Sequence, residues 1–130
     1  MMYISWADVE DGVRHIFSKL PNLDDYDGIA APARGGLVPG TMLSHLTNLP
    51  LLTFDPKDPL PDTLKSKRYI IFDEICDTGG TLAHLTNCPA QHFTATLYKR
   101  YSAKFNPDLV WRTVEHDDWL VFPWEMSADD

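Results

Sequence analysis

The chain has 130 residues, of which 44% are hydrophobic, so it is long and apolar enough to form one folded domain, predicted over residues 1–130. Its net charge of −8 argues against a nucleic-acid-binding surface, and its two cysteines lack the spacing of a disulfide scaffold or a zinc site. No apolar run is long enough to cross a membrane and no signal-peptide pattern opens the chain, which predicts a cytoplasmic protein.

The first predicted element is an amphipathic helix over residues 5–20. Ser5 is placed to cap this helix, and Asp8, three residues later, completes an imperfect capping box. Apolar residues recur at spacings of three and four and form one stripe: Trp6, Val9, Val13, Ile16, Phe17 and Leu20. Such a stripe predicts a structural helix that packs against the core.

The next segments predict a strand, a turn, a helix and a second strand. Residues 27–33 are mostly small and apolar, which is typical of a short buried strand. Arg34-Gly35-Gly36 then turns the chain into a helix over residues 37–47. Residues 49–54 predict the second strand, and Pro50 indicates that it begins late or lies at an edge of the sheet, because proline has no N–H to donate.

A proline-rich segment over residues 55–67 predicts a loop that is too short and too polar to be a second domain. Two interpretations of this loop stay open. It is either a lid over a functional site or a plain surface connection.

The most informative stretch is the strand predicted over residues 68–73 and the turn that follows it. The strand runs into two adjacent carboxylates, Asp73 and Glu74, and Asp77 follows three residues later. Thr78-Gly79-Gly80-Thr81 then opens a helix, where backbone N–H groups, hydroxyls and the missing Cβ atoms suit a phosphate. Three acids at a buried strand end are costly unless sugar hydroxyls or a metal ion bind there. The stretch therefore predicts a site for a phosphorylated sugar.

A helix over residues 80–88 and strands over residues 92–98 and 109–114 complete the predicted pattern. Strands that alternate with helices predict an α/β fold with a mostly parallel, twisted sheet flanked by helices. Such a sheet binds ligands beyond the carboxyl ends of its strands. Because Lys99-Arg100 and the two turns described above all fall at such ends, one shared site is expected.

The stretch from Asp73 to Thr81, with the apolar strand before it, resembles the signature motif of the type I phosphoribosyltransferases, which bind phosphoribosyl pyrophosphate. Residues 33–40 are similar to the pyrophosphate-binding loop of the bacterial xanthine-guanine enzymes of this family, which act on 6-oxopurines. Lys99, the Trp119 region and residues 123–125 resemble the purine-binding elements of the same subgroup. The resemblance covers roughly residues 27–126 and implies a phosphoribosyltransferase-like core with a small C-terminal base-binding hood.

The resemblance implies sugar and phosphate contacts for the matched residues. Asp73 and Glu74 would hold the ribose hydroxyls and, through water, a magnesium ion. Arg34 and Gly35 would bind pyrophosphate. The 5′-phosphate would be cradled by Thr78, Gly79, Gly80 and Thr81.

It also implies contacts with the base. Asp77 would lie near the purine N7 and act as the general acid/base, and Lys99 would donate to the 6-oxo group. Trp119 would stack on the base and the Leu120 backbone would contact its edge. Glu125 matches the acidic position near a second magnesium ion.

The implied function is purine salvage. A magnesium-dependent enzyme would join guanine, xanthine or hypoxanthine to the phosphoribosyl group and release pyrophosphate. A cation at the 6-oxo position selects oxopurines over adenine, whose amino group would meet it as a second donor. A homodimer or homotetramer is expected, with small molecules and no nucleic acid as binding partners.

One departure from the family pattern concerns its closing loop, which usually carries a Ser-Tyr pair. Thr53-Phe54 and the short proline-rich segment stand in that region. A protein that binds phosphoribosyl pyrophosphate or a nucleotide as a regulator, without catalysis, is therefore an open alternative. The same transfer to another base, such as a pyrimidine, is a second alternative, which Lys99 and Trp119 disfavour.

Overall fold

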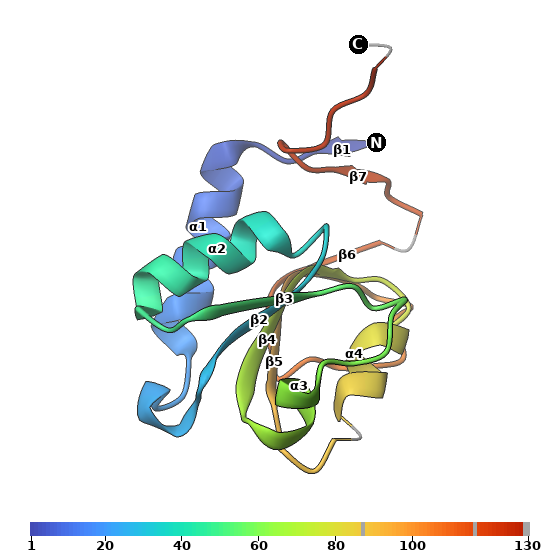
Figure 1. Cartoon of the computed structure of the whole chain (residues 1–130). Coiled ribbons are helices and arrows are strands. Elements are labelled where there is room, and N and C mark those ends of the chain that lie inside the picture. The colour runs from blue at the N-terminus through green and yellow to red at the C-terminus, as the bar shows by residue number, and fades with distance from the viewer. Residues whose placement is uncertain (87, 116, 129–130) are drawn as a thin grey trace.

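The computed structural model describes residues 1–86, 88–115 and 117–128, and its central feature is a five-stranded parallel sheet (Figure 1). The strands, in spatial order, are β3 (Leu51–Phe54), β2 (Gly28–Pro32), β4 (Tyr69–Cys76), β5 (Phe93–Arg100) and β6 (Leu109–Val114). Each neighbouring pair is parallel, so the carboxyl ends of all five strands lie along one edge of the sheet. The predicted parallel α/β fold is confirmed.

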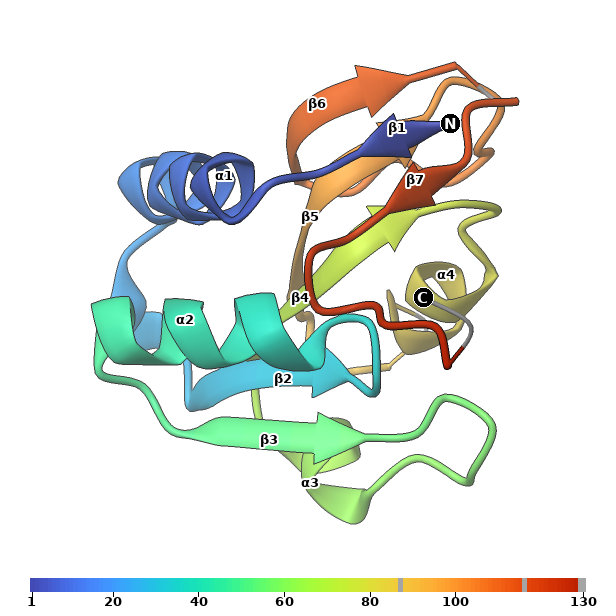
Figure 2. The same ribbon diagram turned by 90° about the horizontal axis from the view of Figure 1, so that it is seen from above.

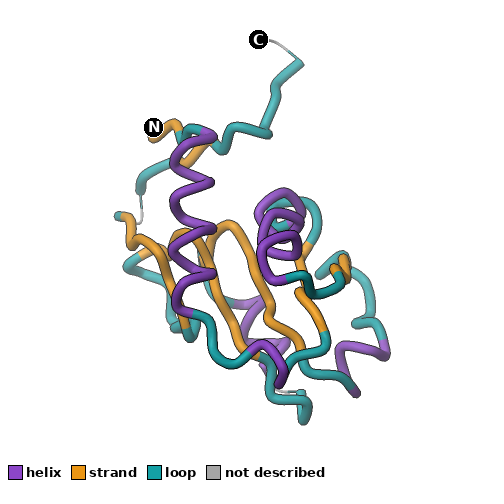
Figure 3. The backbone as a smooth tube through the Cα atoms, turned by 90° about the vertical axis from the view of Figure 1, so that its left-hand side faces the viewer, coloured by secondary structure: helices purple, strands orange, loops and turns teal. Residues whose placement is uncertain are grey.

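Helices cover both faces of the sheet. The helices α1 (Trp6–Lys19) and α2 (Leu37–Thr47) pack over one face, as Figures 2 and 3 show. The short helices α3 (Asp62–Ser66) and α4 (Gly80–Thr86) lie on the other face, and a 3-10 turn, η1 (Leu23–Asp25), leads into β2. Within the described residues, no helix has both the length and the apolar character that a membrane crossing requires.

The start of α1 shows how the sequence sets an element boundary. The Ser5 hydroxyl accepts a hydrogen bond from the Asp8 N–H at 3.0 Å, and the Asp8 carboxylate accepts one from the Ser5 N–H at 3.0 Å. Two backbone donors at the helix start are satisfied in this way, so the predicted capping box is complete.

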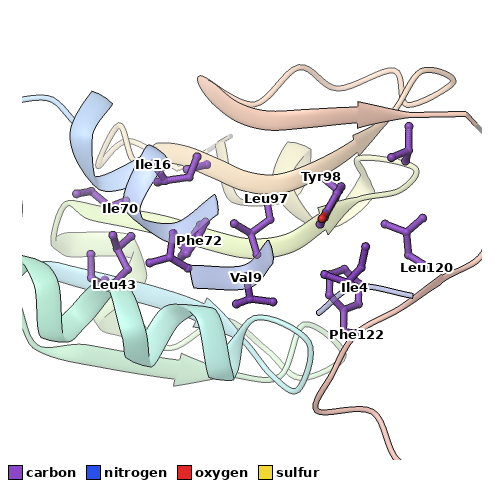
Figure 4. Packing of buried hydrophobic residues seen from close by; sticks show 14 of the residues in the cluster. Ile4, Val9, Ile16, Leu43, Ile70, Phe72, Leu97, Tyr98, Leu120 and Phe122 are labelled. Carbon is purple, nitrogen blue, oxygen red and sulfur yellow. The ribbon is translucent and has the colours of Figure 1, made fainter. Parts of the chain in front are cut away.

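Two apolar clusters hold the layers together. The larger lies between the sheet and the helices α1 and α2, and Figure 4 shows Phe72 and Leu97 beside Val9 from α1. The smaller joins the opposite face to α3 and α4 through Ile71, Leu64 and Leu82. Because β4 contributes to both clusters, its near-continuous apolar run is that of a strand buried on both faces.

The structure places β3 at the edge of the sheet, as Pro50 predicts. The strand begins at Leu51, one residue after the proline. The Pro50 carbonyl still accepts a hydrogen bond from the Ile29 N–H at 2.9 Å. Proline thus costs the ladder no bond here, because only its carbonyl is used.

Several predicted boundaries are wrong. The segment over residues 55–67 is not all loop, since it contains α3. The central strand continues beyond residue 73 to Cys76, so Glu74 as well as Asp73 lies inside β4. The next strand likewise runs on to Arg100, and α4 ends at Thr86, before the predicted residue 88.

A second, smaller sheet has no counterpart among the predicted elements. The strand β1 (Met2–Tyr3) pairs in parallel with β7 (Leu120–Val121), so the two ends of the chain meet. Figure 4 shows Leu120 and Phe122 beside Ile4 and close to Tyr98 of the main sheet. Two-residue strands carry no readable period, and only this tertiary packing makes them strands.

Candidate functional site

A cleft of about 790 Å³ opens at the carboxyl edge of the main sheet. Its walls come from four parts of the chain: the turn between β2 and α2, the end of β4 with the residue that follows, the end of β5, and the C-terminal segment. Its lining residues include Arg34, Gly35, Glu74, Asp77, Arg100, Trp119, Leu120 and Glu125. The predicted convergence of separate turns on one site is therefore present in the fold.

The turn between β2 and α2 brings backbone and acid into close contact. Arg34 is exposed at this turn and its peptide bond with Ala33 is cis. A methyl group added at Gly35 would coincide with the Glu74 carboxylate. Glycine at residue 35 thus lets the Glu74 carboxylate lie over the turn, where any larger residue would displace it.

Asp73 and Glu74 are adjacent acids at the end of β4. The Glu74 N–H donates to Asp73 Oδ1 at 2.9 Å. Burial raises the pKa of Asp73, although hydrogen bonds from Glu74 oppose the rise. Burial, and then the charges of Asp73 and Glu125, raise the pKa of Glu74 to about 9. A buried acid and a partly buried acid that repel each other are costly alone, so the pair suits a ligand with hydroxyls or a cation.

Glu125 approaches this pair from the C-terminal segment. Its carboxylate Oε1 accepts a hydrogen bond from the Phe122 N–H at 2.9 Å, and its own N–H donates to the Phe122 carbonyl at 3.0 Å. Glu125 therefore fixes the turn after β7. It also lines the cleft, and its charge is felt by Glu74.

Asp77 lies in the turn after β4, and its side chain remains 61% exposed. Arg100 Nε donates to Asp77 Oδ1 at 2.7 Å. Arg100 itself is only 8% exposed, because its Nη1 also donates to the carbonyls of Glu115 at 3.1 Å and Asp118 at 2.5 Å. The carboxylate is thus accessible to a ligand on one side and held by a guanidinium on the other.

The Thr78–Thr81 turn has a backbone conformation that depends on glycine at residue 79. Gly79 has φ of +90°, and a Cβ there would meet Phe105, so this position requires glycine. The Gly80 N–H donates to the Thr78 hydroxyl at 3.3 Å. Gly80 and Thr81 line a separate pocket of about 210 Å³ that also contacts Phe54, Pro56 and Leu60 of the proline-rich segment.

Lys99 does not line the large cleft. Its Nζ donates to the Arg100 carbonyl at 3.2 Å, and its charge opposes the rise in the pKa of the Cys76 thiol that burial causes. Neighbouring residues of a strand point to opposite faces, so Lys99 and Arg100 do not share one side of β5.

Trp119 and Leu120 form the C-terminal wall. Trp119 is 65% exposed, although it is a large aromatic residue at the mouth of the cleft. Its carbonyl accepts a hydrogen bond from the Met2 N–H at 2.7 Å, and the Val121 carbonyl accepts one from the Ile4 N–H at 2.8 Å. Pairing with β1 thus uses the groups on one side of β7 and leaves the Leu120 backbone directed to the other side.

The structure therefore gathers most of the predicted site residues, but not all. Asp73, Thr78, Gly79 and Lys99 line neither pocket, and Gly80 and Thr81 line only the smaller one. Arg100 was not predicted as a site residue. The alternation of side chains along a strand was a usable signal, because it allows only one of Lys99 and Arg100 to face the cleft.

The acidic side chains at this edge differ from a preformed metal cage. Within the described residues, no group of three or more His, Cys, Asp or Glu side chains could hold a metal ion by itself. Magnesium does not require such a cage, since it usually binds one or two carboxylates, several waters and substrate phosphates. The all-oxygen donors Asp73 and Glu125, whose charges both act on Glu74, fit that pattern.

Known proteins resemble this chain over nearly its whole length, although no family model matches it. A xanthine-guanine phosphoribosyltransferase from Desulfotalea psychrophila is 29% identical over 139 residues, covering 96% of this chain and 86% of that protein. One from Idiomarina loihiensis is 24% identical, covering 95% and 86%. The crystal structure of a purine phosphoribosyltransferase from Pyrococcus horikoshii superimposes with a TM-score of 0.80 at 29% identity, covering 97% of this chain and 95% of that one.

Proposed function

We propose that the chain is a type I phosphoribosyltransferase, like the relatives that it resembles, and that it transfers the 5-phosphoribosyl group of phosphoribosyl pyrophosphate to a 6-oxopurine. The products are pyrophosphate and guanosine, xanthosine or inosine monophosphate. The relatives named as xanthine-guanine or purine phosphoribosyltransferases support this proposal, because the match extends over most of their own length.

The observation that carries this proposal is the composition of the large cleft. It contains an exposed guanidinium (Arg34), a partly buried acid (Glu74), an accessible carboxylate (Asp77) and an exposed indole (Trp119). These groups match, in turn, a pyrophosphate, a ribose, a proton donor or acceptor and an aromatic base. The volume of about 790 Å³ is within the range of small-molecule sites.

The sugar phosphate is assigned to the two turns that flank β4. Arg34 and Gly35 take the pyrophosphate, Asp73 and Glu74 take the ribose hydroxyls, and the Thr78–Thr81 loop takes the 5′-phosphate. Two features of the loop support the last assignment. The positive φ of Gly79 gives the loop its shape, and a Cβ placed on Gly80 would approach only the Thr78 hydroxyl, which leaves room for an anion.

Asp77 is assigned the proton transfer. A purine nitrogen forms its bond to the anomeric carbon as the pyrophosphate oxygen leaves, and the ring must lose a proton. Asp77 is exposed toward the cleft while Arg100 holds one of its oxygens, so the other oxygen is available to the base. Arg34 offsets the charge that develops on the leaving pyrophosphate.

The base is assigned to the C-terminal wall. Trp119 supplies a stacking surface, and the Leu120 backbone supplies hydrogen bonds at the purine edge. Lys99 is assigned to the 6-oxo group, for which its Nζ must leave the Arg100 carbonyl that it contacts in this structure.

Magnesium is the proposed cofactor. Asp73 would hold one ion through water and Glu125 would lie near a second, and the metal would neutralise the pyrophosphate and so improve it as a leaving group. The high pKa of Glu74 is consistent with this assignment, because a cation would compensate the charges that contribute to it.

We further propose that residues 1–130 act as one catalytic domain, in a cytoplasmic homodimer or homotetramer. Gel filtration with light scattering tests the assembly, and a monomer at working concentration would contradict it.

The test of the function is a steady-state assay with phosphoribosyl pyrophosphate, magnesium and each of guanine, xanthine, hypoxanthine, adenine and orotate. Turnover of at least one 6-oxopurine, with adenine and orotate inactive, is expected. Turnover of orotate alone would shift the proposal to another base, and no turnover by the folded protein would refute it.

A binding protein without catalysis is the second candidate. It is favoured by the segment over residues 55–61, whose three prolines restrict its movement and which lacks the Ser-Tyr pair of a closing loop. Calorimetry that detects binding of phosphoribosyl pyrophosphate, together with an inactive assay, would select this candidate.

A further inference from the structure

Arg100 is a buried arginine that belongs to two walls of the cleft at once. It is 8% exposed and lines the cleft from the end of β5. Its Nε donates to the Asp77 carboxylate at 2.7 Å, on the β4 side. Its Nη1 donates to the carbonyls of Glu115 and Asp118, in the segment that leads to β7.

These bonds connect the proposed proton-transfer group to the proposed base-binding wall. Asp118 directly precedes Trp119, so the bond to its carbonyl fixes the chain one residue before the indole. The bond to Asp77 fixes a carboxylate that is 61% exposed and would otherwise sample several rotamers. One planar group thus sets the position of the acid relative to the base.

We propose that Arg100 is a positioning residue for the purine half of the reaction. This inference rests on the proposed function and extends it. The Arg100 side chain aligns Asp77 with the purine that stacks on Trp119, and it does not contribute to binding of the phosphoribosyl pyrophosphate. Its bonds to Asp77, Glu115 and Asp118 carry this role, and none of these three residues is assigned to the sugar or its phosphates.

The chemistry of the side chain favours arginine at this position. Nε and Nη1 point in fixed directions from one plane, which lets a single side chain donate to a carboxylate and to backbone carbonyls together. A lysine at residue 100 would keep the charge but offer one small ammonium group, so it could hold Asp77 or the carbonyls but not both. Arg100→Lys should therefore lose part of the positioning effect, and Arg100→Gln should lose more of it.

The ion pair with Asp77 adds little to stability, because the carboxylate is more than half exposed and solvent screens it. The effect of losing Arg100 is expected in catalysis. A misplaced acid or base costs about 10–100-fold in rate, which sets the expected scale.

The experiment compares Arg100→Gln and Arg100→Lys with Arg112→Gln, a matched control. Arg112 lies one strand away on β6, stacks on Trp111 and does not line the cleft. For Arg100→Gln, kcat/KM for the oxopurine should fall about 10–100-fold, while KM for phosphoribosyl pyrophosphate changes less than about 3-fold. Arg100→Lys should lie between this variant and the wild type, and Arg112→Gln should match the wild type.

A second readout does not require activity. Hydrogen exchange of the intact protein should speed up in Arg100→Gln both around residue 77 and across residues 117–121, and Arg112→Gln should leave both segments unchanged. If Arg100→Gln does not fold, Arg100→Lys carries both measurements.

The proposal is overturned if Arg100→Gln changes KM for the purine and KM for phosphoribosyl pyrophosphate together, or if it changes neither kcat nor KM for the purine. It is also overturned if Arg112→Gln lowers kcat/KM for the purine in the same way, or if hydrogen exchange in the two segments is unaffected. Failure of the proposed function is a different result, since the wild-type protein would then be inactive. In that case the exchange data alone decide whether Arg100 holds the two walls.

Discussion

Asp77 and its partner show how a single contact sets the position of a side chain in the cleft. The carboxylate faces solvent on one side and Arg100 Nε at 2.7 Å on the other. Such an arrangement orients a proton acceptor without burying it. By contrast, the adjacent acids Asp73 and Glu74 are inside a strand, where burial raises the pKa of both. The acids at this edge of the sheet therefore differ in solvent exposure.

Replacement of Asp77 by Asn removes the proposed acceptor at nearly constant shape. We expect kcat to fall about 10²–10⁴-fold, the usual contribution of general acid–base catalysis. The melting temperature should change little. Asp25→Asn, an exposed acid in η1, is the control and should retain full activity. An Asp77→Asn enzyme with wild-type kcat would remove Asp77 from the mechanism.

Trp119 is the proposed stacking surface. Stacking on an aromatic side chain contributes about 1–3 kcal/mol per base, so Trp119→Ala should raise KM for the purine about 5–150-fold. Trp119→Phe should keep KM for the purine close to the wild-type value, because phenylalanine also provides an aromatic ring. Tyr101 has the same exposure of 65% and lies outside the cleft, so Tyr101→Ala serves as the control. Unchanged purine KM in Trp119→Ala would show that the base binds elsewhere.

At the scale of single residues, the sequence identifies candidate residues but not the direction of their side chains. The acids, the glycine turn and Arg34 stand out because their types at a strand end have few structural explanations. Arg100 does not stand out, because its importance comes from carbonyls of residues 115 and 118 that only the fold brings near. Lys99 and Arg100 are neighbours in sequence, and the pleat of β5 separates them.

At the scale of elements, α1 depends on close packing against the sheet. Gly12 is buried in this helix, and a Cβ there would meet the Trp111 and Leu97 side chains at 2.5–2.9 Å. The glycine thus allows the helix to approach β5 and β6. Helix propensity alone would favour another residue, so packing decides this position.

Gly12→Val should therefore destabilise the protein by about 1–3 kcal/mol through overpacking. Ala7→Val, on the exposed face of the same helix, is the control and should cost only the difference in helix propensity, about 0.5 kcal/mol. Urea denaturation measures both. Equal effects of the two changes would mean that α1 does not pack on Trp111 as described.

Element predictions from the sequence succeed where local signals are strong. The boundaries of α2 and β6 agree with the prediction, and the capping box of α1 forms as expected. The errors arise where tertiary contacts extend or create an element. Pairing with β5 carries β4 through its charged residues to Cys76, and β1 and β7 form only because they meet each other.

At the scale of the whole molecule, a buried histidine ties the smaller helical layer to the sheet. His92 is 8% exposed, its Nδ1 accepts a hydrogen bond from the Tyr69 N–H at 3.0 Å, and its Nε2 lies 2.6 Å from the Leu64 carbonyl of α3. Both contacts are satisfied only by the neutral ring with its proton on Nε2. Burial lowers the pKa of His92, opposed by the Leu64 hydrogen bond.

This lowered pKa predicts a loss of stability in acid. The unfolded chain, with a histidine pKa of about 6.5, binds the proton more readily than the folded protein, so stability falls as the pH drops below about 6.5. His92→Gln should show a smaller loss over that range, whereas His45→Gln, at an exposed position of α2, should follow the wild type. The raised pKa of Glu74 makes stability rise as the pH drops. Each variant is therefore compared with the wild type at the same pH, so that this effect cancels. The measurement is the free energy of unfolding as a function of pH. Parallel curves of this free energy for His92→Gln and the wild type would contradict this account.

The central claim is that the sugar, the phosphates and the base occupy one arrangement along the carboxyl edge of the sheet. A crystal structure with guanosine monophosphate tests it most directly. The 5′-phosphate is predicted on the Thr78–Thr81 loop, the ribose hydroxyls at Asp73 and Glu74, and the guanine stacked on Trp119 with its imidazole ring beside Asp77. A nucleotide bound away from this edge of the sheet, or a base that leaves Trp119 uncovered, would contradict the claim.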